Sequence, residues 1–490
     1  MTVPAQPIEI PRLELEPILP EIIVVGMAIV VLLADAIRPS RDMRLALTLS
    51  LVGLGAAAFF SLQLWDWSGD ITVLGGMVSA DRFGVFFREV ILGSAAVGLL
   101  FSYPYLKQTG EGRGEYFALL LFATSGMMLI SVAADLIVVF LALEILSLSL
   151  YVMAGFSWRR LASQEASLKY FLLGAFSSAF FLYGIAFAYG ATGTTSIGAM
   201  ARTLSGESGT TLALALVAGG LLVVGFAFKV SAVPFHMWTP DVYQGAPTPV
   251  TAFMAAGTKV AAFAALLRVL TTALGPVSWD LRPALWAIAA ITMVLGSTLA
   301  IAQTDVKRML AYSSIAHAGF VLVGVVAVSQ EGVSGSMFYL VAYAAMILGG
   351  FGVAMLVSGR GEERTSLDSY AGLARRSPWL AAVLALFLLS LAGIPPTAGF
   401  IAKVVVFQAA VQAGQSALVV IAVLASVVAA FFYLRVIVLM YMREPEEAGL
   451  VPAGAGPGLG LAVTAALTLA LGVFPSLLLD VLRSAAILRW

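Results

Sequence analysis

Long apolar stretches, each bounded by charged residues, glycine or proline, follow one another along almost the whole chain. A helix needs about 20 apolar residues to cross a bilayer core of about 30 Å. The pattern therefore predicts an all-α polytopic membrane protein with about fourteen transmembrane helices. The predicted spans are residues 19–37, 44–64, 83–103, 115–132, 134–156, 166–191, 209–233, 250–272, 282–302, 306–329, 333–358, 378–410, 415–442 and 459–482.

Two groups of five predicted helices occupy residues 115–272 and 273–443. Because each group has an odd number of crossings, the second must enter the membrane upside down relative to the first. Each group also contains a helix broken by proline at a comparable place: Pro234 in the first, Pro395 and Pro396 in the second. We therefore predict two inverted five-helix repeats, each with a broken helix. Three helices in residues 1–114 precede the repeats, and one helix in residues 444–490 follows them.

A helix break inside a membrane frees backbone carbonyls that only protein or water can satisfy. A single proline more often produces a simple kink. Here two breaks lie at matching repeat positions and each is near a lysine. This coincidence favours hydrated interiors at both breaks.

Composition restricts the chemistry that the chain can perform. It is 61% hydrophobic and 11% charged, whereas soluble domains carry about 25% charged residues. With no cysteine, the chain cannot form disulfides, iron–sulfur clusters or thiolate zinc sites, and two histidines argue against a haem or a metal centre. No glycine-rich nucleotide loop is present. We expect no cofactor and no metal on this chain, a lipid bilayer around it and no nucleic-acid partner.

Lysine and arginine fall unevenly on the two sides of the predicted helices. With the N-terminus outside, cytoplasmic segments hold 14 of the 27 and the opposite segments hold six, so 27 − 14 − 6 = 7 lie within the spans. Positive residues favour the cytoplasmic side, which predicts that both termini face outward. The first span follows acidic residues and lacks a cleavage pattern, so we expect a retained helix rather than a signal peptide.

Charged side chains deep in the predicted spans are the candidate functional groups. Glu144 and Lys259 each lie about ten residues into a span, which at about 1.5 Å per residue places them roughly 15 Å deep, near the midplane. Lys229 lies just before the first break and Lys403 one to two turns after the second. A charge at such depth costs at least about 2.5–3.5 kcal/mol and requires a partner, water or a function.

A proton relay and a static ion pair both explain Glu144 and Lys229. If the two groups approach within about 6 Å, at an effective dielectric near 20 they attract by about 3 kcal/mol, and moving the carboxylate releases the lysine proton. A static pair would only cancel the burial cost of each charge. It would not explain Lys259 and Lys403, which outnumber the mid-membrane carboxylates. We therefore favour a relay through these four residues.

Other charged residues are candidates of second rank. His317, at mid-depth of its helix, is either a proton relay between lysines or a satisfied core histidine. Lys169 either extends to the membrane surface or, through Ser177 and Ser178, contacts the region of Glu144. His236, in the loop after Pro234, is interpreted as a structural anchor. The remaining groups are interpreted as interfacial charges: Arg88, Glu89, Asp135, Arg268 and Arg435.

Residues 225–263, GFAFKVSAVPFHMWTPDVYQGAPTPVTAFMAAGTKVAAF, resemble the antiporter-like membrane subunits of respiratory complex I, the bacterial NADH:quinone oxidoreductase. Further matches are LPEIIVVGMAIVVLLADAI at 19–37, LALEILSLSLYVMAGF at 141–156, DVKRMLAYSSIAHAGFVL at 305–322 and SLAGIPPTAGFIAKVVVF at 390–407. Lysine at position 403, and a chain that stops eight residues past Leu482 without a lateral helix, resemble the subunit N group of this family rather than subunit M or the longest subunit.

The resemblance implies a mechanism and partners. Glu144, Lys229, Lys259 and Lys403 match the family's proton path, and NADH, FMN, iron–sulfur clusters and quinone would be bound by partner subunits. The neighbours would be subunits K and M in the cell inner membrane, with both termini on the periplasmic side. Two alternatives are a subunit of a multisubunit Na⁺/H⁺ antiporter, which resembles the same fold, and a non-transporting scaffold of the membrane arm. The PDVYQGAPTP and LAGIPPTAGF segments favour the oxidoreductase.

Overall fold

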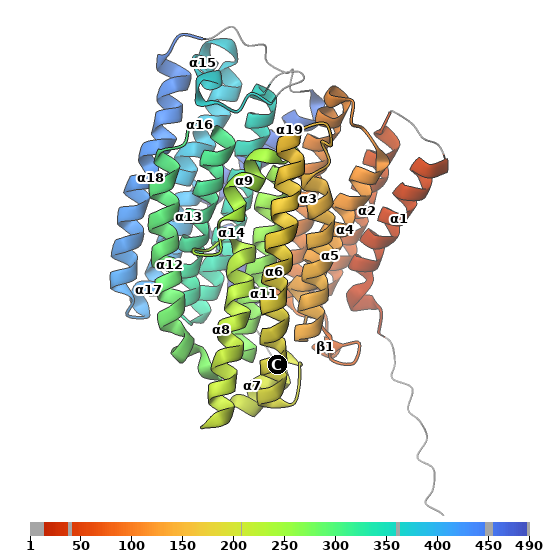
Figure 1. The fold of residues 1–490 in the computed structure, drawn as a ribbon, viewed down its shortest axis with the longest axis vertical. Coiled ribbons are helices and arrows are strands. Elements are labelled where there is room, and N and C mark those ends of the chain that lie inside the picture. Colours follow the sequence, from red (N-terminus) through yellow and green to blue (C-terminus); the bar gives the residue numbers. More distant parts are fainter. Residues whose placement is uncertain (1–13, 38–41, 207, 359–362, 446–453, 488–490) are drawn as a thin grey trace, which may run out of the picture.

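The computed structural model describes residues 14–37, 42–206, 208–358, 363–445 and 454–487. They form one bundle of helices that run side by side (Figure 1). Thirteen helices in these ranges are long and apolar enough to cross a membrane. The crossing predicted for residues 378–410 is divided between two shorter apolar helices. Counted as one, this divided crossing gives the fourteen predicted, and the all-α polytopic membrane fold is confirmed.

The N-terminal part packs at one side of the bundle. Its helices begin and end close to the predicted spans, and Asp81 starts the third by accepting a hydrogen bond from the Gly84 amide. Its elements are η1 (Glu16–Ile18), α1 (Leu19–Ile37), α2 (Arg44–Gln63), η2 (Leu64–Asp66), β1 (Thr72–Val73), β2 (Val78–Ser79) and α3 (Arg82–Thr109). The two short strands pair antiparallel, Thr72 opposite Ser79.

The first repeat contains a long helix that ends at the first proline break, a short helix beyond that break, and a final helix interrupted by two π-helical turns. Its elements are α4 (Gly114–Val132), α5 (Leu136–Ala154), α6 (Leu161–Thr192), α7 (Ile197–Leu204), α8 (Thr210–Val230), α9 (Trp238–Gly245), α10 (Thr248–Phe253), η3 (Met254–Thr258), α11 (Lys259–Arg268) and η4 (Val269–Ala273).

The second repeat has the same order of elements, and its broken helix consists of α16 and α17. Its elements are η5 (Gly275–Val277), α12 (Ser278–Ile301), α13 (Val306–Val326), α14 (Gln330–Val357), η6 (Leu367–Tyr370), α15 (Leu373–Arg376), α16 (Pro378–Ala392), α17 (Ala398–Gln412) and α18 (Ser416–Met442). The chain then continues through α19 (Ala455–Val473) and α20 (Ser476–Ala485).

Matching β-bridges relate the two repeats. Asp135 pairs antiparallel with Ser196, and Asp305 pairs antiparallel with Ser366. Both pairs are 61 residues apart, since 196 − 135 = 366 − 305. Asp135 begins α5 and Asp305 begins α13, each as a side-chain cap. The same local structure therefore recurs in both halves of the chain, as expected for repeats of one ancestral unit.

The most buried part of the bundle lies between the repeats. The crossing at Thr248–Ala273 is completely buried, and α13 and α14 are almost completely buried. Outer helices such as α1, α2, α6 and α18 instead expose many apolar side chains, including Leu33, Phe59, Phe176 and Val427. Apolar surface of this kind is stable when it faces lipid tails. The interior helices are thus the ones that carry the candidate site.

Candidate functional site

The three predicted lysines all lie inside the protein. Lys229, Lys259 and Lys403 are 3%, 2% and 5% exposed. Each lies where regular α-helical hydrogen bonding is interrupted: Lys229 in the last turn of α8, Lys259 directly after the π-helical turn η3, and Lys403 in α17 after the second break. Such interruptions leave backbone groups that can bind an ammonium or water.

Lys229 on α8 and Glu144 on α5 each bind a serine of a neighbouring helix. The Lys229 Nζ donates a hydrogen bond of 2.7 Å to Ser147 Oγ and lies 5.7 and 5.3 Å from the ring centres of Tyr151 and Tyr170. Glu144 is half-buried and accepts a hydrogen bond from Ser178. Among the described residues no ion pair joins Glu144 to Lys229; two serines bind the charges instead.

Lys259 is bound by a neighbouring helix of the other repeat. Its Nζ donates to the backbone carbonyl of Ser314 and, at 2.6 Å, to the Ser314 hydroxyl. The Tyr343 hydroxyl donates to the same Ser314 hydroxyl at 2.7 Å, and the Tyr343 ring centre is 5.2 Å from Nζ. A cation is stabilised over such a ring by the ring's quadrupole.

His317 lies on α13, three residues beyond Ser314. Its Nδ1 is 2.7 Å from the Tyr339 hydroxyl and its Nε2 is 3.2 Å from the Tyr433 hydroxyl. Its ring centre is 5.3 Å from that of Tyr343. The imidazole therefore has a hydrogen-bond partner on both nitrogens, and its ring centre is 5.8 Å from that of Phe320, over which Lys403 lies.

Lys403 is bound by the end of the half-helix α16. Its Nζ is 2.9 Å from the Ala392 carbonyl oxygen and 3.3 Å from that of Leu391, and it lies 4.7 Å from the Phe320 ring centre. The C-terminus of a helix carries partial negative charge, which favours a cation there. At Gly393, with φ +87°, a Cβ would lie 2.9 Å from Lys403 Cδ. Glycine thus both ends the helix and leaves room for the lysine.

Lys169 lies apart from this group. Its side chain is 41% exposed and its Nζ forms ion pairs of 2.7 Å with Asp241 and 2.6 Å with Glu165. Ser178, which binds Glu144, is nine residues further along α6, or about 13.5 Å at 1.5 Å per residue. Of the two alternatives for Lys169, the structure supports the exposed side chain and not contact with the Glu144 region, because the ammonium is bound by the carboxylates of Asp241 and Glu165.

Glu363 is the centre of a charged cluster that the sequence did not reveal. Its carboxylate accepts hydrogen bonds from Tyr105, Arg160, Lys307 and both the amide and hydroxyl of Thr248. Burial opposes its ionisation, but Lys307 and Arg160 outweigh burial and lower the pKa of Glu363 to about 2. Lys307 itself has a fully buried side chain.

No feature of the sequence distinguishes Glu363 in advance. It stands in a loop segment of several charges, GEERTS, and its partners lie 56 to 258 residues away along the chain. The cluster joins both repeats, since Arg160 and Thr248 belong to the first and Lys307 and Glu363 to the second. Its function is to bind the starts of α10 and α13 together.

Two arginines interpreted as interfacial charges are buried instead. Arg88 forms an ion pair of 2.7 Å with Glu21, and Arg268 forms one of 2.7 Å with Asp81, with both arginine side chains 1% exposed. Burial alone would raise the pKa of Asp81, but Arg268 and the hydrogen bonds from Ser79 and Gly84 hold it below its ordinary value. These pairs connect α3 to α1 and α11, so their role is in packing.

The remaining second-rank groups have local roles. Asp135 caps α5 at a short turn, as the interfacial interpretation allows. Arg435 donates to the carbonyls of Ile301 and Gln303 at the end of α12, and Glu89 is half-buried in α3. His236 lies in the compact segment directly before α9.

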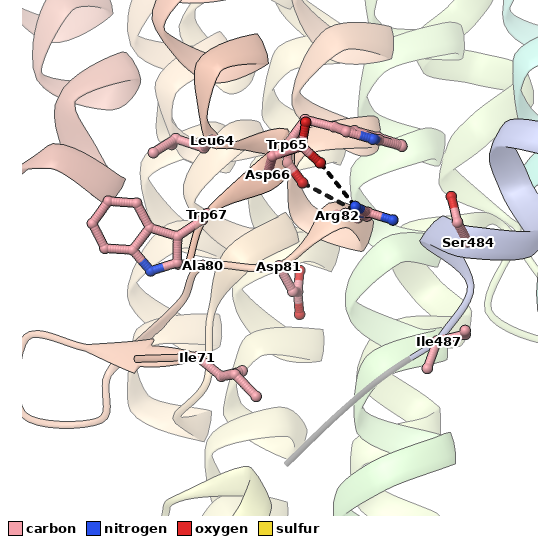
Figure 2. Close-up of a pocket in the computed structure, with 10 residues that line it drawn as sticks. All are labelled: Leu64, Trp65, Asp66, Trp67, Ile71, Ala80, Asp81, Arg82, Ser484 and Ile487. Carbon is pink, nitrogen blue, oxygen red and sulfur yellow. Dashed lines mark hydrogen bonds and ion pairs between the residues drawn. The ribbon is translucent and has the colours of Figure 1, made fainter. Parts of the chain in front are cut away.

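Some open clefts lie away from Lys229, Lys259 and Lys403. Figure 2 shows one of about 350 Å³ at the junction of α2 and α3, where Arg82 binds Asp66 at 2.8 Å and the Trp65 carbonyl at 3.0 Å. Ser484 and Ile487 form its opposite wall. Near the ends of the described chain, η1 contacts β2 and α20 contacts α3. Within the described residues no group of histidines and carboxylates is arranged to hold a metal ion.

The fold and the site define a class of protein: a polytopic membrane subunit built from two inverted repeats, with a row of buried lysines across both. Residues 133–429 match the family described as NADH:quinone oxidoreductase/Mrp antiporter, transmembrane region. The chain belongs to this family, in the group of the NADH-quinone oxidoreductase subunits N.

Curated relatives support this assignment over nearly the full length. The chain is 45% identical to NADH-quinone oxidoreductase subunit N 3 of Streptomyces griseus, covering 97% of this chain and 95% of that one. It is 43% identical to subunit N of Trichlorobacter lovleyi, covering 96% and 97%.

Solved structures share the fold. A chain of respiratory complex I from Thermus thermophilus with bound aureothin matches with a TM-score of 0.81 at 35% identity, covering 95% of this chain and 99% of that one. A chain of the Mrp complex from Dietzia sp. matches with a TM-score of 0.83 at 23% identity, covering 96% and 97%. The second likeness shows a common fold only.

Proposed function

We propose that this chain is a proton-translocating membrane subunit of an NADH:quinone oxidoreductase, in which quinone reduction in partner subunits drives protons across the membrane. The relay consists of Glu144, Lys229, Lys259 and Lys403, and His317 links the last two. One observation carries the proposal. Three ammonium groups lie in an apolar interior and, among the described residues, are bound by hydroxyl and carbonyl oxygens rather than by carboxylates.

An ammonium without a paired anion is sensitive to its surroundings. Dipoles and aromatic rings stabilise it only partly, so a change in hydration or in a neighbouring charge alters which group holds the proton. A fully paired ammonium would lack this property, because separating a buried ion pair costs several kcal/mol, about 3–5. Lys169 is placed outside the relay because its ammonium is partly exposed and is bound by Asp241 and Glu165, away from Glu144.

The redox groups belong to partner subunits in this proposal. NADH, FMN, the iron–sulfur clusters and quinone would be bound elsewhere, because this chain has no cysteine to ligate a cluster. Subunits K and M are the proposed neighbours in the cell inner membrane. The excess of lysine and arginine on one side of the predicted helices, 14 against six, supports an orientation with both termini on the periplasmic side.

Proton pumping by the assembled complex tests the proposal. In inverted membrane vesicles carrying Lys259→Ala, we expect NADH-driven proton uptake to fall while the complex remains assembled. Lys107→Ala, which removes an exposed lysine of α3, is the matched control and should pump like the parent. A non-transporting scaffold would give a different result. In that case Lys259→Ala would lose neither proton uptake nor quinone reduction, or would lose both together with assembly.

The Mrp structure has the same fold, so the fold alone does not distinguish the antiporter alternative. The composition of the purified complex tests this alternative. Purification through an affinity tag on this chain should recover subunits that carry flavin and iron–sulfur clusters. Recovery of small membrane partners alone, with sodium-dependent proton exchange in vesicles, would instead identify an antiporter subunit.

A further inference from the structure

Tyr151 lies on α5, seven residues beyond Glu144, and its ring lies beside the Lys229 ammonium. The side chain is 5% exposed, and its hydroxyl, whose neighbour is the Ser147 hydroxyl, makes no hydrogen bond of good geometry to a described residue. Burying a hydroxyl unpaired costs about 1–3 kcal/mol by protein mutation data. Buried polar atoms without a protein partner commonly bind an ordered water. The hydroxyl is therefore a candidate water-binding group.

A small cavity lies beside this hydroxyl. It has a volume of about 10 Å³ and is lined by Lys229, Ser178, Ser177 and Gly174, among others. A space of about 10–15 Å³ of this kind holds one water molecule. Gly174 connects the cavity to the tyrosine, because a Cβ at that position would lie 1.9 Å from the Tyr151 hydroxyl oxygen. The hydroxyl thus lies directly against a residue of the cavity wall.

The groups around the cavity belong to both ends of the first relay step. Ser178 donates to Glu144, and Lys229 itself forms part of the wall. The Lys229 Nζ is 5.7 Å from the Tyr151 ring centre, and Gly174, against which the hydroxyl lies, is one helical turn from Ser178 on α6. With Glu144 and Lys229 not in direct contact, a proton moving between them needs an intermediate group of this kind.

We propose that the Tyr151 hydroxyl, together with one water molecule in this cavity, is a further proton-carrying group between Lys229 and Glu144. The inference rests on the proposed function. In the step, the Lys229 ammonium gives a proton to the water and hydroxyl, which pass one of their own protons to the Glu144 carboxylate. The lysine becomes a neutral amine and the glutamate a neutral carboxyl group, while the water and the phenol are left unchanged. The reverse transfer restores both charges.

Tyr151→Phe tests this proposal in the intact complex, because it removes the hydroxyl and keeps the ring. We expect proton translocation to fall by about 100-fold or more, because a positioned proton-transfer group contributes about 100-fold to 10,000-fold. Two tyrosines serve as controls. Tyr116→Phe removes a buried hydroxyl bound to Ser102 at 2.9 Å, and Tyr183→Phe removes an exposed one. Both should pump like the parent.

A parallel measurement of Lys229→Ala distinguishes failure of the Tyr151 proposal from failure of the proposed function of the chain. If Lys229→Ala loses pumping and Tyr151→Phe pumps like the parent, the role of Tyr151 is wrong and the relay remains. If both variants pump like the parent, the proposed function itself is wrong.

A difluorotyrosine at position 151 provides the second readout if Tyr151→Phe does not assemble. It keeps the size of the phenol and makes the hydroxyl more acidic. A proton-carrying role predicts a shift in the pH profile of proton translocation. An unchanged profile would overturn the proposal, because a purely structural hydroxyl does not respond to its acidity.

Discussion

The ammonium of Lys403 lies 2.9 Å from the carbonyl oxygen of Ala392, the last residue of the half-helix α16. Helix α16 ends at Ala392, and Lys403, eleven residues further on, binds the carbonyl oxygens that this helix end leaves free. The lysine therefore closes the helix end as well as carrying a charge into the interior, and these two roles can be separated by substitution.

Lys403→Arg keeps the positive charge at this helix end but removes a group that can lose its proton, since a guanidinium stays protonated in proteins. We expect proton translocation to be lost and thermal stability to stay near that of the parent. Lys403→Met removes both roles, and the unpaired carbonyls should add a stability loss of about 1–3 kcal/mol. Proton uptake and thermal unfolding of the purified complex measure the two effects. Full pumping by Lys403→Arg would contradict a role in proton transfer.

Ser314→Ala removes the hydroxyl that binds both Lys259 and Tyr343. The backbone carbonyl of residue 314 still binds the ammonium, so we expect the complex to assemble and to pump several times more slowly, at a barrier cost of about 1 kcal/mol. Ser336→Ala is the matched control, because that buried serine bonds only to backbone carbonyls of Gly332 and Val321. Equal rates in the two variants would contradict this role of Ser314.

Glu363→Gln leaves the buried Lys307 without its carboxylate. Breaking a buried ion pair by removing one partner costs about 3–5 kcal/mol, and we expect a loss of unfolding free energy near the lower end, since the amide still accepts hydrogen bonds.

The same pair predicts a pH dependence. The pKa of Glu363 is about 2 in the folded protein, against an ordinary value of 4.5. A lowered pKa contributes stability that is complete above pH 4.5 and is lost as pH falls towards 2. The stability difference between parent and Glu363→Gln should therefore shrink over that interval, measured by unfolding in detergent. A difference that stays constant would show that the carboxylate charge does not stabilise the fold.

Lys169→Gln should have little effect, because exposed ion pairs contribute only about 0–1 kcal/mol. We expect pumping within the range of the parent and a small decrease in thermal stability. Proton uptake is measured in the same vesicles as for Lys259→Ala, which provides the positive control. A loss of pumping as large as that of Lys259→Ala would return Lys169 to the relay.

The sequence by itself determined the helices, the two inverted repeats and the positions of the buried lysines. Apolar stretches of membrane length have few other stable arrangements, and a lysine such as Lys259 is conspicuous because a charge in hydrocarbon is costly. The broken helices were visible for a similar reason, since proline removes a backbone donor wherever it stands.

Only the tertiary structure decided which groups bind these charges. Lys259 lies against Ser314, 55 residues away, and Glu363 binds Tyr105, 258 residues away. Hydroxyls and carbonyls are too common in the sequence to mark a partner, and a glutamate in a charged loop gives no sign that it will be buried. Contacts of this kind depend on how the helices rotate and pack against one another, which periodicity along one chain does not specify. For the same reason Arg88 and Arg268 were misplaced and the alternatives for Lys169 stayed open: the depth of a residue in its own helix does not show which groups of the neighbouring helix lie against it.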